Sequence, residues 1–418
     1  MSRLIPSPSA KRSLAIATFV NTVGSGMFMA SSALYFVRVV HLPATSVGIG
    51  LMVAGLVGLA GGIPVGDLAD RRGPREVYIT TLVVQFLTMA SLVLVHSFVA
   101  FVLLKSLDAL AASSAGSSRG ALVRRVGGER PAVFRAKLKA LSNAGVPIGA
   151  LAAGFAVQID SKAAYTTLIL VNAASYLISA AFVAGIPHYD PISRPMHSRR
   201  WSALADRPFA AFTAVNGLMS MQYAVTLIPL PIWIASHTNA PRWIISATLA
   251  LNTVMCVLLQ VRFGSRTDSL PTSARAMRMA GLMFLISCPL MALIGEMPAW
   301  QAATITVLAV AVHTVGELWH SSGSFTIGFE LAPRHAQGQY LGLQGVGTGI
   351  GGALAPALLT FLCLDGGRLG WFLLGCIFAL VGLLAERVVY WAERSQSEKA
   401  SEDVRLGMNQ QKAEFGSG

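Results

Sequence analysis

The chain has 418 residues, of which 54% are hydrophobic and only 12% are charged. An average soluble domain carries about 25% charged residues, so this composition excludes an ordinary soluble protein. A formal net charge of +13 would suit a nucleic-acid-binding protein, and the positions of the basic residues decide that question below.

The apolar residues fall into runs that are long enough to cross a lipid bilayer. About 20 helical residues span a hydrocarbon core of about 30 Å. We therefore predict an all-α membrane protein. Its twelve transmembrane helices cover residues 13–40, 44–66, 76–96, 98–122, 133–158, 163–186, 207–236, 243–263, 276–296, 299–325, 339–363 and 369–392.

The basic residues are distributed unevenly between the two sides of this predicted bundle. Of the 32 Lys and Arg residues, 27 lie on one side, four lie on the other, and Lys105 lies inside a helix. Such an excess marks the cytoplasmic side of a membrane protein. We expect a multi-pass protein of the inner (plasma) membrane, surrounded by lipid, with residues 1–12 and 393–418 in the cytoplasm and no nucleic-acid partner. The final residues, AEFGSG, have the composition of an expression-vector remnant.

The sequence offers no pattern for metal binding or catalysis. The four cysteines lie within or at the edge of predicted helices and lack CxxC or His-rich spacing, so we interpret them as small apolar packing residues. No P-loop or HExxH motif occurs, and no nucleophile elbow of the GxSxG kind stands out. We therefore expect no cofactor, no metal site and no enzymatic activity.

A polar segment over residues 187–206, rich in Pro, Ser and Arg, divides the chain nearly in half. It predicts a cytoplasmic linker between an N-terminal six-helix bundle (13–186) and a C-terminal six-helix bundle (207–392). The halves also repeat weakly, as expected of a rocking transporter. The repeated features are GxxxD at Gly66 and at Gly264, GVPIGALAAG at Gly145 and GTGIGGALAP at Gly347, and the asparagines Asn21 and Asn216.

The loop after the second predicted helix carries the most specific motif. The segment GDLADRRGPREV resembles the GxLxDRxGR/K signature of the major facilitator superfamily, and the matching residues are Gly66, Leu68, Asp70, Arg71, Gly73 and Arg75. The resemblance covers about residues 13–392 and implies two pseudo-symmetric six-helix bundles. A glycine permits close helix approach, and the charged residues can meet a helix N-terminus, carboxylates or carbonyls. We expect this loop to be a conformational switch that latches the outward-facing state; the alternative is an ordinary basic loop.

The fifth predicted helix carries a weaker motif. Its segment NAGVPIGALAAG resembles the gxxxGPxxGG pattern of twelve-helix drug/proton antiporters through Gly145, Pro147 and Gly149, although Val146 interrupts the Gly-Pro pair. Small residues also pack membrane helices in general, and this explains much of the pattern.

Ionisable residues at membrane depth are costly and usually functional. In the fourth predicted helix, Lys105 and Asp108 are three residues apart and so occupy neighbouring positions on one helix face. Two interpretations stay open: a self-contained structural ion pair, or a pair that responds to protons or faces the substrate.

The tenth predicted helix contains HTVGELWHSSGS, and Thr306, His313, Glu317, His320 and Ser324 fall on one stripe of it. The TxGE element resembles a pattern in proton-coupled facilitators, including multidrug exporters and peptide carriers. Desolvation favours the protonated carboxyl, and histidine titrates near neutral pH. We predict proton coupling by Glu317, Asp108 and His313; a structural, hydrogen-bonded role is the alternative for each histidine.

The family resemblance places helices one, four, seven and ten around a central cavity. Facing alone selects Asn21, Ser25, Phe28 and Tyr35 of the first helix and Asn216 and Tyr223 of the seventh, with interhelical hydrogen bonding as the alternative for each of them. Two of the ionisable residues described above, Lys105 and His320, complete the candidate cavity residues.

The leading hypothesis is a secondary active transporter that exports a drug-like or amphiphilic metabolite in exchange for protons by alternating access. We expect a monomer whose partners are protons and a small-molecule substrate. Proton-coupled import of a small solute or peptide is the second hypothesis, and a membrane sensor or scaffold without transport is the third.

Overall fold

The computed structural model describes residues 8–159, 161–190, 202–241 and 243–415, and its described part consists of helices and short connections without strands. Residues 1–7 and 191–201, which include most of the expected N-terminal segment and linker, lie outside the described residues.

The first bundle contains seven α-helices and two short irregular helices. They are α1 (Pro8–Leu34), η1 (Tyr35–Val39), α2 (Ala44–Leu59), α3 (Gly62–Arg72), α4 (Pro74–Ser91), η2 (Leu92–Leu94), α5 (Phe98–Gly127), α6 (Pro131–Ile159) and α7 (Lys162–Ala184).

The second bundle follows residues 191–201. It comprises α8 (Ser202–Ala205), α9 (Arg207–Ser220), α10 (Gln222–Val225), α11 (Pro229–His237), α12 (Trp243–Gly264), α13 (Leu270–Leu293), η3 (Ile294–Glu296), α14 (Ala299–Glu330), α15 (Gln337–Thr360), η4 (Phe361–Asp365) and α16 (Gly367–Phe415).

Length and composition identify membrane spans among the described residues. Ten helices qualify, and an eleventh is the pair α2 and α3, which is bent by 42°. In chain order α6, 29 residues long, occupies the place of the helix predicted over 133–158. The structure thus agrees with a multi-pass, all-α membrane protein and is consistent with the twelve predicted helices.

Three predicted helices differ in detail from those observed. The second bends near Gly61 and Gly62, where glycines weaken the helix and Ser114 and Ser117 donate hydrogen bonds to the two glycine carbonyls. The seventh is interrupted before Pro229, which lacks an N–H and would clash in a continuous helix. The twelfth continues beyond residue 392 because the following Glu, Lys, Ala, Arg and Gln residues are strong helix formers.

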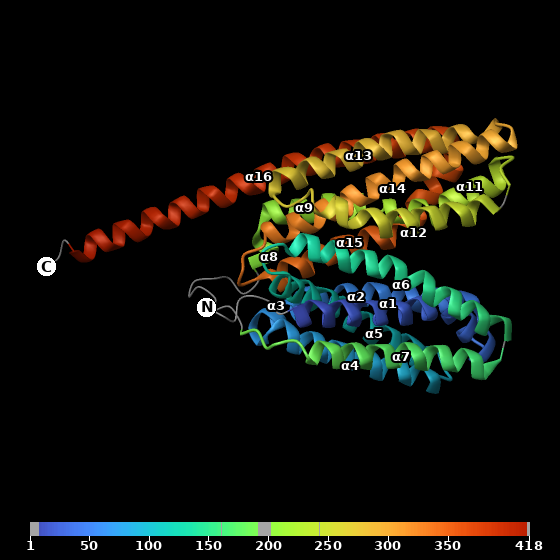
Figure 1. Cartoon of the computed structure of the whole chain (residues 1–418), viewed down its shortest axis with the longest axis horizontal. Coiled ribbons are helices and arrows are strands. Elements are labelled where there is room, and N and C mark those ends of the chain that lie inside the picture. Colours follow the sequence, from blue (N-terminus) through green and yellow to red (C-terminus); the bar gives the residue numbers. More distant parts are fainter. Residues whose placement is uncertain (1–7, 160, 191–201, 242, 416–418) are drawn as a thin grey trace.

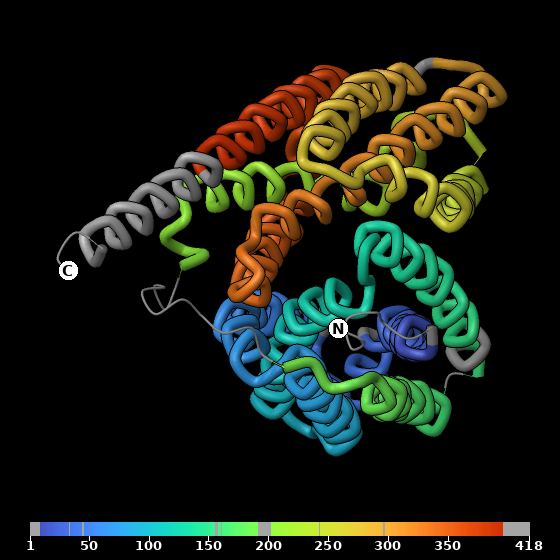
Figure 2. The backbone as a smooth tube through the Cα atoms, turned by 60° about the vertical axis from the view of Figure 1, so that its left-hand side comes forward, coloured from blue at the N-terminus to red at the C-terminus, as the bar shows by residue number. Residues whose placement is uncertain are grey.

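Each bundle has a hydrophobic core of its own. One core is drawn from residues 10–186 and the other from residues 203–392. Figures 1 and 2 show the bundles as two bodies side by side, with α15 and α12 of the second facing the first. Separate cores allow each bundle to move as a unit, which is what rocking requires.

The bundles meet near one end, which we call the basic face. It is the end formed by the connections at residues 73, 128–130, 265–269 and 331–336, and it exposes arginines such as Arg71, Arg72 and Arg334. Figure 1 shows the two bundles in contact near the N-terminus and diverging toward the opposite end. The contacts of α3 with α15 and of α6 with α12 join them at this face.

Candidate functional site

Helices α3 and α15 join the two bundles at a close contact that we call the seam. Glycines lie on both sides of it. A Cβ atom added to Gly66 would lie 2.1 Å from the carbonyl oxygen of Gly338, and one added to Gly342 would lie 2.3 Å from that of Gly62. Because both obstacles are backbone atoms, a side chain at these positions would force the helices apart. The close contact therefore depends on glycine.

A carboxylate of the first bundle caps a helix of the second. Asp70 Oδ1 accepts a hydrogen bond of 2.8 Å from the Gly338 amide, and Oδ2 accepts one of 3.2 Å from the Gln339 amide. The first amides of a helix lack intrahelical partners and carry the positive end of its dipole. The residue before α15, Ala336, supplies no side-chain cap. Asp70 therefore supplies the missing cap from across the seam.

The other residues of the GxLxDRxGR/K motif support this contact from within the first bundle. Arg71 pairs with Asp67 at 2.8 Å, and Asp67 in turn accepts a hydrogen bond from Gln339. Gly73 ends α3 with a φ of 99°, which glycine adopts readily. Leu68 is partly buried in α3. The motif is thus assembled around the seam, and its role as a switch stays a prediction.

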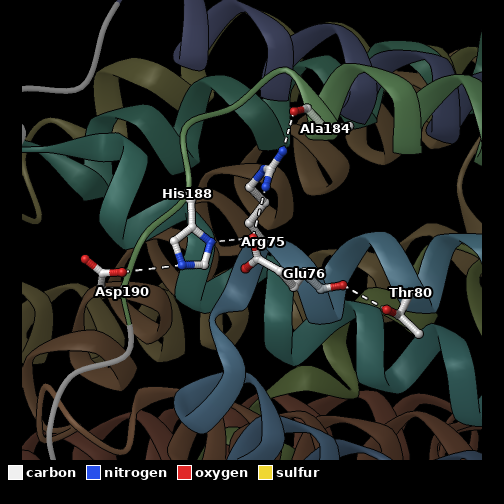
Figure 3. Close-up of polar contacts among 6 residues, drawn as sticks. All are labelled: Arg75, Glu76, Thr80, Ala184, His188 and Asp190. Atoms are coloured by element: carbon white, nitrogen blue, oxygen red, sulfur yellow. Dashed lines mark hydrogen bonds and ion pairs between the residues drawn. The ribbon is translucent and has the colours of Figure 1, made fainter.

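Arg75 fastens the segment that follows α7 rather than the seam (Figure 3). Its guanidinium donates hydrogen bonds to the Ala184 carbonyl and to Glu76. Glu76 Oε1 lies 2.6 Å from His188 Nδ1, and His188 Nε2 lies 3.4 Å from Asp190. All residues of this network belong to the first bundle, so the network holds residues 184–190 against α4.

A cavity of about 530 Å³ lies between the bundles. Its walls come from α1, α5 and α6 of the first bundle and from α9, α10, α12, α14 and α15 of the second. Three of the predicted cavity residues, Asn216, Tyr223 and His320, line it. His320 Nε2 lies 3.1 Å from Asn216 Oδ1, and the His320 and Tyr223 rings are 5.7 Å apart.

The structure places the other predicted cavity residues elsewhere in the first bundle. Lys105 forms a buried ion pair of 2.6 Å with Asp108, and its ammonium lies 4.7 Å from the centre of the Phe28 ring. Ser25 donates to the Asn21 carbonyl, and the Tyr35 hydroxyl donates to the Val93 carbonyl. Lys105 and Asp108 therefore form an ion pair, which both interpretations of their spacing allow.

The fifth-helix motif packs α6 against α1. A Cβ atom on Gly149 would lie 1.9 Å from the Val23 carbonyl oxygen, and one on Gly145 would lie 2.3 Å from Thr22 Oγ1. Pro147 lies within α6 without breaking it. These residues bring two helices of one bundle into close contact.

Glu317 lies beside the cavity in a polar setting. Its Oε2 accepts a hydrogen bond of 2.8 Å from Asn252 Nδ2, and its Oε1 lies 3.8 Å from the Cys256 thiol. Asn252 also donates to Thr314. Lys139 of α6 is near enough to interact with Glu317 electrostatically. The Glu317 carboxylate thus contacts α12 and is attracted electrostatically to Lys139 of the opposite bundle.

His313 lies one turn from Glu317 but faces the core of the second bundle. Its Nε2 is 3.2 Å from the Gln222 carbonyl oxygen, its Nδ1 is 3.3 Å from Ser287 Oγ, and its ring lies against Phe284. It is fully buried and does not line the cavity. The structure therefore separates it from His320, which does.

Three cations that line the cavity were not among the predicted site residues: Arg119 of α5 and Arg135 and Lys139 of α6. In the sequence they belong to the basic residues expected on the cytoplasmic side. Their spacing could have indicated a shared site, because Arg135 and Lys139 are four residues apart and so lie on one face of a helix. Gln260 and Gln344 also line the cavity and were not predicted.

Comparison with known proteins agrees with this architecture. Residues 14–356 match the Major Facilitator Superfamily. The chain is 26% identical over 372 residues to the multidrug resistance protein MdtH of Yersinia pestis (strain Pestoides F), covering 85% of this chain and 87% of the relative, and equally to that of Yersinia pseudotuberculosis serotype O:1b (strain IP 31758).

The fold is also found among solved structures. A bacterial homologue of the iron transporter ferroportin in an outward-facing state superposes with a TM-score of 0.74 at 14% identity, covering 92% of this chain and 99% of that one. The family match spans most of the chain, including the helices that form the seam and the cavity. This multi-pass membrane protein therefore belongs to the Major Facilitator Superfamily of transporters.

Proposed function

We propose that the chain is a proton-coupled secondary transporter that moves an amphiphilic small molecule by alternating access. The observation that carries this proposal is the Asp70-capped seam, which joins two separately cored bundles beside a cavity. We further propose that the protein works as a monomer and catalyses no covalent chemistry.

The seam supplies the two-state element that alternating access needs. Its hydrogen bonds to the Gly338 and Gln339 amides exist only while the bundles meet at the basic face. Hydrogen bonds to a charged group contribute about 1.5 to 3 kcal/mol each, enough to bias a conformational equilibrium strongly. Rocking the bundles apart at this face breaks them.

The charge distribution supports one orientation in the membrane. The basic face carries the excess of Lys and Arg, so we propose that this face and both termini are on the cytoplasmic side of the inner (plasma) membrane. The described conformation is then closed toward the cytoplasm.

Glu317 is the proposed proton site. It lies beside the cavity and between two helices, so its charge affects both its hydrogen bond to Asn252 and its attraction for Lys139. Asp108 is the second proposed proton site. It pairs with Lys105 and does not line the cavity. His313 stays in the proposal as a hydrogen-bonded neighbour one turn away.

Export in exchange for protons is the first mode we propose, supported by the relatives whose name is multidrug resistance protein. Cotransport of substrate and proton is the second, supported by the proximity of Lys139 to Glu317. In cotransport, a bound substrate and a bound proton must favour one another, whereas in exchange they must compete.

Everted membrane vesicles distinguish these modes. Respiration acidifies the vesicle lumen and quenches acridine orange; each compound of an amphiphile panel is then added outside. Exchange releases protons from the lumen and restores the fluorescence, whereas cotransport quenches it further. Vesicles without the protein control for compounds that collapse the gradient themselves. Glu317→Gln should abolish either response, and an unchanged response would remove Glu317 from the mechanism.

A further inference from the structure

The cavity between the bundles has an unbalanced charge. Its lining includes Arg119, Arg135 and Lys139, and no Asp or Glu is among the described residues that line it. Two of these cations lie on adjacent turns of α6, and the third comes from α5. Three positive groups around one cavity repel one another, and the excess attracts negative charge.

Among the described residues, none of these three cations is in direct contact with a carboxylate, although Lys139 is within electrostatic range of Glu317. The Arg135 guanidinium lies 5.0 Å from the centre of the Phe325 ring, and the Lys139 ammonium lies 5.6 Å from the centre of the Tyr223 ring. Arg119 is hydrogen-bonded to Tyr78. None of the three forms an ion pair within the part of the chain that the structure describes.

Basic residues with a structural role in this chain are paired differently. Lys105 meets Asp108 at 2.6 Å, and Arg278 meets Glu386 at 3.0 Å. Removing a cation from water is costly, and pairing with a carboxylate normally offsets that cost. The cavity cations form no such direct pair in the described part of the chain, and only Lys139 is attracted by a carboxylate, Glu317, so their hydrogen-bond donors are available to a ligand.

The remaining walls suit the rest of such a ligand. Asn216, Gln260 and Gln344 add polar amide groups that are fixed by hydrogen bonds to neighbouring residues, and Phe325 and Tyr223 add aromatic surfaces. An arginine guanidinium can donate two parallel hydrogen bonds to one carboxylate, and a neighbouring lysine adds a positive charge. The lining therefore combines a site for an oxyanion with a surface for an apolar group.

We propose that the cargo is an organic anion, whose oxyanion is held by Arg135, Lys139 and Arg119 and whose apolar part lies against Phe325 and Tyr223. This inference rests on the proposed transport function, because it names the substrate class of the same cavity.

An anionic cargo also determines the sign of proton coupling. Glu317 is faced by Asn252 and Cys256 of α12, by Lys139 of α6 and by Tyr223 of α10. An anion bound to Lys139 repels the Glu317 carboxylate, so the anion and a proton on Glu317 favour each other, and this coupling is reciprocal. An organic anion therefore favours the cotransport mode.

The test uses the full chain, purified in an uncharged detergent, and three ligand scaffolds: naphthalene, biphenyl and a decyl chain. Each scaffold carries a carboxylate, an alcohol or an ammonium group. Bound ligand raises the unfolding temperature. We expect the carboxylates to raise it and the matched alcohols and ammonium compounds to do so far less. Arg135→Gln and Lys139→Gln should each weaken carboxylate binding about tenfold or more.

Two further variants separate charge recognition from misfolding. Lys139→Arg keeps the charge and should retain most of the binding. Arg262→Gln removes an exposed cation of α12 outside the cavity and should bind the carboxylates like the unchanged protein. Alcohols or ammonium compounds that stabilise as well as the carboxylates would overturn the proposal. So would full carboxylate binding by both glutamine variants, or no preference for the anion on any scaffold.

Flux in proteoliposomes distinguishes this inference from the proposed function. Preferential flux of the carboxylates, with one proton taken up alongside, supports both. Preferential flux of ammonium compounds overturns the anionic cargo and leaves transport standing. Carboxylate binding through Arg135 and Lys139 without any flux overturns transport and leaves the anion site standing.

Discussion

The two seams between the bundles are related by the internal repeat, yet only one is capped. At the first, α3 meets α15 with glycines on both sides, and Asp70 caps α15. At the second, Gly264 of α12 meets Ala136 of α6, where an added Cβ would lie 2.4 Å from the Ala136 Cβ. Asp268, the counterpart of Asp70, is exposed and forms no hydrogen bond among the described residues.

The helix starts explain this difference. Helix α15 begins Gln337-Gly338-Gln339 and offers two backbone amides to the carboxylate. Helix α6 begins at Pro131, five residues before Ala136, so the amides beside the second seam lie inside the helix and bond to its own carbonyls. A cavity of about 480 Å³, lined by Asp268, Arg130 and Glu330 among others, occupies the space beside the second seam. A repeated GxxxD motif therefore forms a cap only where the facing helix begins at the seam and leaves its first amides free.

The largest predicted effect follows from filling the first seam. In Gly338→Val the new side chain would collide with the Gly66 backbone, so the bundles could not close at the basic face. We expect transport to fall by more than about tenfold, since closure is an obligatory step of alternating access. Flux in proteoliposomes measures it.

The matched control for this substitution lies on the same helix. Around Gly352 no heavy atom lies within 4 Å of an added Cβ, so Gly352→Val changes the same residue type without a collision. Wild-type flux in Gly338→Val would show that the glycine seam is unnecessary for the transport cycle.

The next effect compares the two aspartates directly. Asp70→Asn removes the negative charge from the α15 cap, whereas Asp268→Asn removes one that caps nothing among the described residues. A hydrogen bond to a charged group contributes about 1.5 to 3 kcal/mol, so Asp70→Asn should favour the state open at the basic face by about 10- to 100-fold. Asp268→Asn should leave the distribution unchanged.

Distances between two spin labels, measured by double electron–electron resonance, check this pair of variants. Spin labels at Arg72→Cys and Arg334→Cys, both exposed at the basic face, report the separation of the bundles there. The exposed Cys376 is replaced by serine to avoid a third label. Equal distance distributions in the two aspartate variants would contradict the asymmetry between the seams.

The first seam shows how far sequence patterns reach. The GDLADRRGPREV segment identified the family and the glycine and aspartate of the seam, because those residue types are dictated by close approach and helix capping. It did not identify α15 as the partner, since a local motif carries no information about which distant helix it meets. The bent second helix was also missed, because hydroxyl groups of α5 stabilise the bend from outside that segment.

The cavity was predicted less well, for an equally physical reason. Of the residues predicted for the cavity, Asn216, Tyr223 and His320 line it, whereas Lys105 does not. The spacing of Lys105 and Asp108 does not decide whether they pair. In the structure they form an ion pair within the first bundle. Arg135 and Lys139 were counted as topology markers because positive charge near a helix end has two explanations. Only the fold shows that they line the cavity between the bundles.

A smaller effect is expected from the polar contact that crosses near the second seam. Arg124 of α5 donates to the Phe329 carbonyl at 3.3 Å and lies 3.5 Å from Glu330 of α14. Both side chains are partly exposed, and such surface pairs contribute about 1 kcal/mol or less. Arg124→Gln should therefore shift the label distances by less than Asp70→Asn does. A shift as large as that of Asp70→Asn would show that the second seam has a latch of its own.

The smallest effect should come from the network within the first bundle. His188→Ala removes contacts of His188 with Glu76 and Asp190, all of which lie on the same side of the seam (Figure 3). Because His188 is about half exposed, its ion pairs contribute little, about 1 kcal/mol or less, to holding residues 184–190 against α4. The same spin-label pair should report unchanged bundle separation, and thermal unfolding should change only slightly. A redistribution of the label distances would mean that this segment, and not the Asp70 seam alone, controls how the bundles close.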